Sequence, residues 1–145
     1  MQRKFRYLPH TADFKFEAYG KTFEEALQNA ASAMLNIMFD IKRIKKENSP
    51  EAKLEIKEKA RSLEDLVWYV LQDLITKIDE KSLPAYFFSV ESFKKTSSSF
   101  FVSGFLHYKK SNKDFSALEV KAVTGHDLSV TQKEGKWIIR AVVDV

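Results

Sequence analysis

The stretch that decides the fold lies near the start of the chain and reads Phe14-Lys15-Phe16-Glu17-Ala18-Tyr19-Gly20-Lys21-Thr22-Phe23-Glu24-Glu25. Apolar side chains alternate with polar ones from Phe14 to Ala18, which predicts a strand with one face in a core and the other in water. Gly20 and Lys21 then turn the chain. The next four residues form a capping box, in which Thr22 caps a helix and Glu25 reaches back to it. The sequence therefore predicts a strand that leads directly into a helix.

The tetrad His10-Thr11-Ala12-Asp13 stands directly before this strand. Side chains at the mouth of a strand are held by a firm backbone and still reach solvent, so the tetrad is a candidate functional site. The alternative is a bend that starts the strand, with Thr11 and Asp13 bonding local backbone. Residues 1–19 form either one strand or two short strands broken at the tetrad.

The spacing of apolar residues predicts two amphipathic helices. The first begins after Thr22 and ends near Phe39, with apolar side chains at steps of three and four residues. The second begins after the N-cap residue Ser62, and its apolar stripe continues to about Glu80. Trp68 lies beside that stripe, where it could cover the edge of a sheet.

The remaining periodic segments alternate apolar with polar residues and are predicted as strands. They are residues 40–44, 52–58, 86–93, 100–108, 118–124, 128–132 and 136–143. The last two form a hairpin through Glu134-Gly135. The predicted class is α+β, a mostly antiparallel sheet with two helices covering one face of it. Residues 1–145 are expected to form a single domain, because a chain of this length suits one core.

The composition excludes several classes of function. The absence of cysteine rules out disulfides, thiolate metal sites and cysteine nucleophiles. No apolar run approaches the roughly 18 residues of a membrane span, and no signal peptide is visible, so we expect a cytoplasmic protein without membrane contact. No Gly-rich phosphate loop, His-Glu-x-x-His helix or nucleophile elbow occurs. The net charge of +4 permits contact with nucleic acid, although lysines that only confer solubility would give the same value.

Residues that could perform chemistry gather in three places. The first is the tetrad, the second is Lys121-Ala122-Val123-Thr124-Gly125-His126-Asp127, and the third is the tail Asp144-Val145. If the last strand lies beside the first, Asp13 joins Asp144 and the terminal carboxylate. Carboxylates this close repel one another unless a proton or a hard divalent cation lies between them. The alternatives are a solvated tail and a polar turn.

These motifs, in their order along the chain, resemble the archease family. The resemblance rests on the tetrad, on residues 121–127 and on a hydrophobic last strand that ends in Asp144-Val145. Two further segments support it, Thr22-Phe23-Glu24-Glu25-Ala26 at the start of the first helix and Gly135-Lys136-Trp137 before the last strand. The chain departs from the family at Gly125, where the family usually has Tyr, and so lacks an aromatic ring beside the predicted site.

The resemblance implies a strand–helix–strand–strand (SHS2-like) module with an inserted segment. It also implies that the chain is not an enzyme but an accessory protein of an RtcB-type RNA ligase, which joins tRNA halves during splicing. Archeases promote the attachment of a guanylyl group to that ligase and allow multiple turnover. Contact with RNA could be indirect, through the ligase, and whether the chain also contacts RNA directly stays open. The family binds a divalent cation, typically calcium, and the ligands implied here are Asp13, Asp144 and the Val145 carboxylate.

Further motif residues are expected to support this site. Lys121 could contact a phosphate or the partner protein, since a flexible ammonium acts as a point charge; the alternative is a solvated strand lysine. His10 could hold the tetrad by bonding backbone. The remaining candidates next to the ligands are Thr11, Thr124, His126 and Asp127.

Two other functions stay open at this point. The chain could be a general RNA-binding or chaperone-like module acting through lysine-rich loops at Lys94-Lys95 and residues 109–113. Against this, no single strand combines aromatic and basic residues as standard RNA-binding strands do. The chain could also be a metal-dependent hydrolase using Asp13, His126 and Asp144, although these are too few ligands for a two-metal site.

Overall fold

The computed structural model describes residues 3–9 and 12–145, and its strands form two antiparallel sheets. The first, here called the terminal sheet, contains both ends of the chain in the order β1-β2-β8-β6, with β7 also paired to β8. Its strands are β1 (Phe5–Leu8), β2 (Phe14–Gly20), β6 (Ala122–Val123), β7 (Ser129–Lys133) and β8 (Lys136–Asp144). The second, here called the three-stranded sheet, has the order β3-β5-β4. Its strands are β3 (Glu51–Ala60), β4 (Ala85–Lys95) and β5 (Phe100–Lys109).

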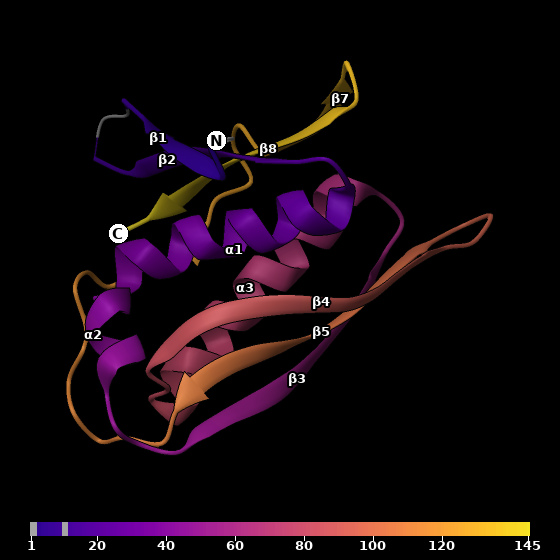
Figure 1. Ribbon diagram of the computed structural model, residues 1–145. Coiled ribbons are helices and arrows are strands. Elements are labelled where there is room, and N and C mark those ends of the chain that lie inside the picture. The colour runs from indigo at the N-terminus through magenta and orange to yellow at the C-terminus, as the bar shows by residue number, and fades with distance from the viewer. Residues whose placement is uncertain (1–2, 10–11) are drawn as a thin grey trace.

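Two long helices lie between the sheets (Figure 1). Helix α1 (Phe23–Met38) packs on β2 and β8 on one side and on β4 on the other, while α3 (Leu63–Lys81) packs on β3 and β5 and reaches β6 and β7. Small side chains let strands approach α1 from both sides, since Ala26, Ala30 and Ala33 are fully buried. Both sheets therefore share one hydrophobic core. None of the helices in the described residues is long and apolar enough to cross a membrane.

The structure confirms the α+β class and the main helices. Thr22 caps α1, with its Oγ1 accepting a hydrogen bond from the Glu25 N–H at 3.1 Å, and Ser62 caps α3 in the same way. The Glu25 carboxylate reaches back to the N–H of Lys21 at 3.2 Å, one residue earlier than the predicted Thr22. Strands β1 and β2 are separate, as the hypothesis of two short strands predicts. β2, α1, β7 and β8 follow in chain order as a strand–helix–strand–strand module, with an inserted segment after α1.

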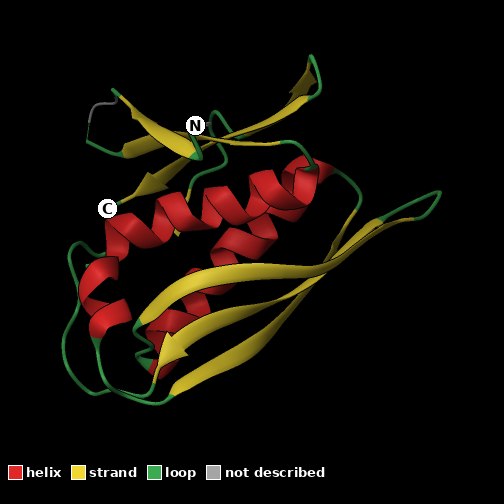
Figure 2. Ribbon diagram, viewed as in Figure 1, coloured by secondary structure: helices red, strands yellow, loops and turns green. Residues whose placement is uncertain are grey.

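Three expectations are wrong. Residues 40–44 do not form a strand, because Asp40 accepts a hydrogen bond from the Arg43 N–H at 3.3 Å and caps a third helix, α2 (Ile41–Lys46). Of residues 118–124, only Ala122–Val123 are a strand, because only these two residues pair with β8. Before them, Leu118 is exposed and Val120 is buried. The strands form two sheets and not one, so the helices cover one face of the three-stranded sheet and also pack on the terminal sheet (Figure 2).

One row of side chains fixes the register of three strands in the terminal sheet. Glu17 on β2 lies opposite Arg6 on β1 and opposite Arg140 on β8. Its carboxylate, in a residue only 5% exposed, accepts hydrogen bonds from Arg6 Nε (3.0 Å), Arg140 Nε (2.9 Å) and Tyr19 Oη (2.9 Å). A shift of β8 by one residue would separate Arg140 from this buried charge. The row therefore holds β2 and β8 in the register that positions their ends.

We expect this row to make part of the folding stability depend on pH. Burial acts to raise the pKa of Glu17, but hydrogen bonds from Arg140, Tyr19 and Arg6 outweigh it and lower the pKa from its usual 4.5 to about 2. A carboxyl with a lowered pKa stabilises the fold above its unfolded pKa. The contribution is thus complete above pH 4.5 and is lost as the pH falls towards 2. Its size is on the order of 2 kcal/mol, because solvent screens the half-exposed arginines.

Urea unfolding of wild type and Glu17→Gln at about pH 6 and about pH 2.5 measures this contribution. The variant should be less stable by on the order of 2 kcal/mol at the higher pH, and most of the difference should disappear at the lower one. Glu64→Gln, at an exposed position in the first turn of α3, controls for the loss of any carboxylate. A stability difference that is the same at both pH values would contradict the assignment.

Candidate functional site

The ends of two paired strands bring the acidic residues of the tetrad and the tail together. β2 begins at Phe14, β8 ends at Asp144, and the two strands are antiparallel with Phe14 opposite Val143. Asp13 directly precedes Phe14, and Asp144 directly follows Val143. This register therefore brings both acids to the same end of the terminal sheet. Asp144 is exposed, whereas Asp13 and Val145 are partly buried.

The backbone turns sharply just before the first of these acids. Ala12 has a φ of 68°, a left-handed conformation that costs an alanine on the order of 1 kcal/mol. Strain of this kind persists only where the surrounding structure holds it, and it is common at binding sites. His10 and Thr11 lie outside the described residues, so their roles stay predictions.

The second motif is held against the end of β8 by a short strand. In β6, Ala122 pairs with Asp144, and Val123 pairs with Val143. The N–H of Lys121 donates to the carbonyl oxygen of Asp144 at 2.7 Å, and Lys121 is exposed. The start of residues 121–127 thus lies directly beside the acidic end of β8, which leaves the Lys121 ammonium accessible to a ligand or a partner.

Two side chains of α3 fix this short strand. Trp68 Nε1 donates to the carbonyl oxygen of Val123 at 3.0 Å, and Gln72 Oε1 accepts from the Val123 N–H at 3.0 Å. Trp68 and Gln72 are four residues apart, so one face of α3 presents both to the same residue. Trp68 covers a sheet edge as expected, but Gln72 was missed. The sequence signal that could have identified Gln72 is its position, one helical turn after Trp68 and at the border of the apolar stripe.

The other residues of the second motif lie in the turn after β6. Thr124 Oγ1 donates to the carbonyl oxygen of His126 at 3.3 Å, and Asp127 pairs with Lys15 of β2 at 3.4 Å. His126 and Gly125 are exposed, and a Cβ at Gly125 would meet no atom within 4 Å. The turn therefore has room for a Cβ atom at this position, where the family usually has Tyr.

Within residues 3–9 and 12–145, no three His, Asp or Glu side chains are grouped so that they could hold a metal ion. The hydrolase hypothesis needs Asp13, His126 and Asp144 as such a group, so the structure argues against it. The predicted cation site needs only two acidic side chains, with the Val145 carboxylate as its third ligand. Calcium and other hard divalent cations take carboxylate oxygens, so the donor chemistry fits, and the site itself stays a prediction.

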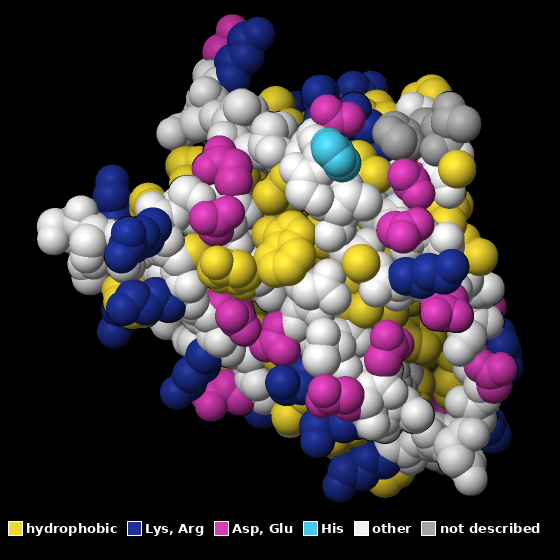
Figure 3. Space-filling model, turned by 180° about the vertical axis from the view of Figure 1, so that it is seen from behind, with side chains coloured by type: hydrophobic (Ala, Val, Ile, Leu, Met, Phe, Trp, Pro, Cys, Tyr) yellow, Lys and Arg dark blue, Asp and Glu magenta, His cyan; other side chains and the backbone are white. Residues whose placement is uncertain are grey.

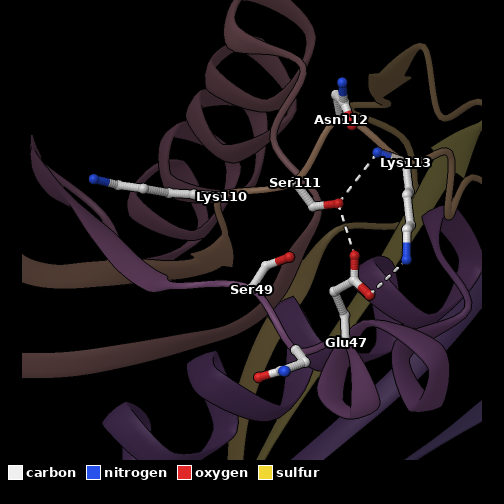
Figure 4. A pocket seen from close by; sticks show the side chains of 7 residues that line it. Glu47, Ser49, Lys110, Ser111, Asn112 and Lys113 are labelled. Carbon is white, nitrogen blue, oxygen red and sulfur yellow. Dashed lines mark hydrogen bonds and ion pairs between the residues drawn. The ribbon is translucent and has the colours of Figure 1, made fainter.

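The lysine-rich loop after β5 is engaged in contacts within the chain. Lys109 is only 7% exposed, and its Nζ donates to the carbonyl oxygen of Glu47 at 2.9 Å. The Glu47 carboxylate accepts from Ser111 Oγ at 2.9 Å and pairs with Lys113 Nζ at 3.1 Å. Figure 4 shows Ser111 and Lys113 converging on Glu47 while Lys110 points away. Two of the lysines that the RNA-loop hypothesis uses therefore fix this loop to the segment after α2.

The sequence matches a family model and individual proteins that all carry the same family name. The model of the Archease protein family (MTH1598/TM1083) matches residues 5–145. The protein archease of Methanosarcina mazei is 33% identical over 147 residues, which cover 99% of this chain and 97% of that protein. The protein archease of Sulfolobus acidocaldarius is 31% identical over 144 residues, which cover 98% of this chain and 99% of that protein.

Two solved structures share the fold. The solution structure of Methanobacterium thermoautotrophicum protein 1598 has a TM-score of 0.81 and 24% identity, over 98% of this chain and 99% of that one. The crystal structure of an archease from Thermotoga maritima, described as a possible chaperone, has a TM-score of 0.60 and 20% identity, over 100% of this chain and 98% of that one. At these identities the likeness concerns the fold alone.

Proposed function

The chain belongs to the archease family, and from this premise we propose that it is an accessory protein of an RtcB-type RNA ligase in tRNA splicing. In this role it promotes guanylylation of the ligase and allows each ligase molecule to complete many turnovers. The observation that carries the proposal is the pairing of Phe14 with Val143, which brings Asp13 and Asp144 to one end of the terminal sheet.

The residues of the chain present oxygen ligands at an accessible edge. The row of Arg6, Glu17 and Arg140 fixes β2 and β8, so the backbone that carries the two aspartates is held in place before a partner arrives. A divalent cation bound by Asp13, Asp144 and the Val145 carboxylate would supply positive charge for phosphate groups. Preformed ligand positions favour binding, because little backbone entropy is lost when the partner docks.

Lys121 is placed to act with this edge. Its backbone is bonded to Asp144, and the residue is exposed. The long side chain of Lys121, anchored by its backbone next to Asp144, would give a second contact for a phosphate or for an acidic group of the ligase. In this proposal the cation site and the flexible, positively charged side chain of Lys121 act at the same end of the terminal sheet.

A ligation assay at limiting ligase tests the proposal. Two RNA halves are joined by the matched ligase with and without this chain, and both the product per ligase molecule and the guanylylated ligase are measured. We expect product to exceed one equivalent of ligase only when the chain is present, with faster accumulation of the guanylylated form. Equal turnover with and without the chain would refute the proposal.

A chaperone-like role is distinguished by the same assay. The Thermotoga maritima relative is described as a possible chaperone, and a chaperone would raise the amount of soluble, active ligase. Normalising the product to soluble ligase separates the two cases. A gain that vanishes after normalisation supports the chaperone role, and a gain that persists supports activation of the ligase.

A further inference from the structure

One face of the three-stranded sheet is left uncovered by the described part of the chain. The long helices pack on the other face, where Ile56, Phe88 and Leu106 are fully buried, and Figure 1 shows the three strands in front of α3. Strand pairing arranges the side chains of the uncovered face, here called the open face, in rows across β3, β5 and β4. The rows are Lys53, His107 and Phe87; Glu55, Phe105 and Ser89; Lys57, Ser103 and Ser92; and Lys59, Phe101 and Lys94.

Two phenylalanines on the central strand provide the main aromatic surface of the open face. Phe101 and Phe105 are both partly exposed and stand roughly 14 Å apart along β5, with the small Ser103 between them. Lys59 Nζ lies 5.3 Å from the ring centroid of Phe101, and Lys53 Nζ lies 4.3 Å from that of Phe105. The faces of both rings are therefore turned towards exposed lysines and not into the core.

A second pair of rings extends this surface towards the edge at β4. The ring of His107 lies 5.6 Å from the ring of Phe87, which is 37% exposed, and His107 Nε2 is hydrogen-bonded to Ser89 Oγ at 2.8 Å. Burial, together with the charge of Lys53, lowers the pKa of His107 from its usual 6.5. The imidazole is thus neutral at neutral pH and presents a flat, uncharged ring.

The open face is basic, unlike the opposite side of the molecule. It carries four lysines and two glutamates, Glu55 within the rows and Glu91 at the bulge of β4. Helix α3, on the other side, carries five acidic residues and two lysines along its length. Figure 3 shows Asp and Glu side chains spread over that side, with Lys and Arg mainly near its rim. A polyanion is therefore attracted to the open face and repelled from the side of α3.

We propose that the open face of the three-stranded sheet binds single-stranded nucleic acid. Unpaired bases stack on Phe101 and Phe105, and the phosphates contact the lysines of β3 and Lys94 of β4. On binding, bases replace Lys53 and Lys59 over the rings, and these lysines turn to the phosphates. A duplex fits poorly, because its bases are stacked inside the helix and cannot reach rings on a sheet.

A groove continues from the open face and lengthens the path available to a single strand of nucleic acid. It starts at Phe87, has a volume of about 1380 Å³ and passes between α1, β4 and the terminal sheet. Three glutamates and six basic residues line it. The basic residues are Arg3, Lys4, Arg6, Lys21, Lys45 and Lys136. Affinity should therefore rise with the length of the strand until the groove is filled. The inference does not depend on ligase activation, because the open face and the acidic edge belong to different sheets.

Fluorescence anisotropy with a labelled single-stranded RNA of about 12 nucleotides tests the proposal, in EDTA and without ligase. The double variant Phe101→Leu/Phe105→Leu keeps apolar side chains on the sheet but removes both aromatic faces, so we expect binding to weaken roughly tenfold or more. RNA that contains 2-aminopurine reports stacking directly. Its fluorescence should be quenched by the wild-type protein and much less by the double leucine variant.

Paired lysine variants test the phosphate contacts and remain informative if the leucine variant does not fold. Lys57→Ser/Lys59→Ser should lower the slope of log affinity against log salt by about 1.4, since each single-strand phosphate contact contributes about 0.7. Lys42→Ser/Lys46→Ser removes the same charge from exposed positions of α2, and binding should stay within about twofold of wild type. Thermal melting by circular dichroism checks that each variant is folded.

Several results would overturn the proposal. One is wild-type protein that binds a duplex of the same sequence as tightly as the single strand, and another is a folded leucine variant that binds like wild type. A leucine variant that slows the ligase but binds RNA normally would also overturn it, because the open face would then contact the protein partner. Since RNA binding is measured without ligase or cation, these failures leave the proposed function untouched.

Discussion

Asp13→Asn and Asp144→Asn, made separately, are expected to abolish the stimulation of RNA ligation while the protein stays folded. Each removes one carboxylate where β2 begins or β8 ends, and the amide that replaces it has the same shape but is a weaker ligand for a hard cation. Ligase turnover should fall roughly tenfold or more, to the unstimulated level. The free energy of unfolding should change by no more than about 1 kcal/mol. Steady-state ligation and urea unfolding measure the two quantities.

Asp114→Asn is the matched control for these variants. Asp114 is exposed, lies in the loop after β5, and accepts a hydrogen bond from the Ser116 N–H at 2.9 Å through an oxygen that asparagine retains. A short extension after Val145 tests the predicted third ligand, because it removes the terminal carboxylate from the edge and should weaken calcium binding in calorimetric titration. If both aspartate variants stimulate the ligase as wild type does, the acidic edge is not the functional site.

The long elements could be predicted because their signals are local. The N-caps Thr22 and Ser62 mark the starts of α1 and α3, and each cap depends only on residues within one helical turn. Helix α2 was missed because six residues are too few for a helical period to show, and its cap Asp40 was assigned to a strand. The division into two sheets also escaped prediction, since it depends on which distant strands pair.

The candidate site also depends on which distant strands pair, and the sequence does not predict this pairing. The meeting of Asp13 and Asp144 could be stated only as a condition on strand pairing, and that pairing is fixed by contacts such as Glu17 with Arg140, which are 123 residues apart. The open face was missed for a related reason. Three of its four lysines come from β3 and its two stacking phenylalanines from β5, so most of its aromatic and basic residues combine only after the two strands pair. A search for both kinds of residue on one strand does not find the pairs Lys53 with Phe105 and Lys59 with Phe101, whose members lie on different strands.

Gly104→Ala should destabilise the protein by about 3 kcal/mol and lower its melting temperature by roughly 10 °C. A Cβ at Gly104 would lie 2.2 Å from the carbonyl oxygen of Ser89 and 3.0 Å from two ring carbons of Phe88. Neither neighbour can give way easily, because Phe88 is fully buried and the Val90 N–H is bonded to Gln28 Oε1 at 2.7 Å. The two strands can approach this closely only when β5 carries a glycine here. Calorimetry measures both quantities.

Gly125→Ala is the matched control, because the added methyl group meets no atom within 4 Å and stability should change by less than about 0.5 kcal/mol. Gly104→Ala should also weaken binding of single-stranded RNA, although it touches no ring of the open face, because β5 carries both Phe101 and Phe105 and moves with the clash. A Gly104→Ala protein as stable as wild type would show that β4 can shift at its bulge. Close approach of β4 to β5 would then be no requirement of the fold.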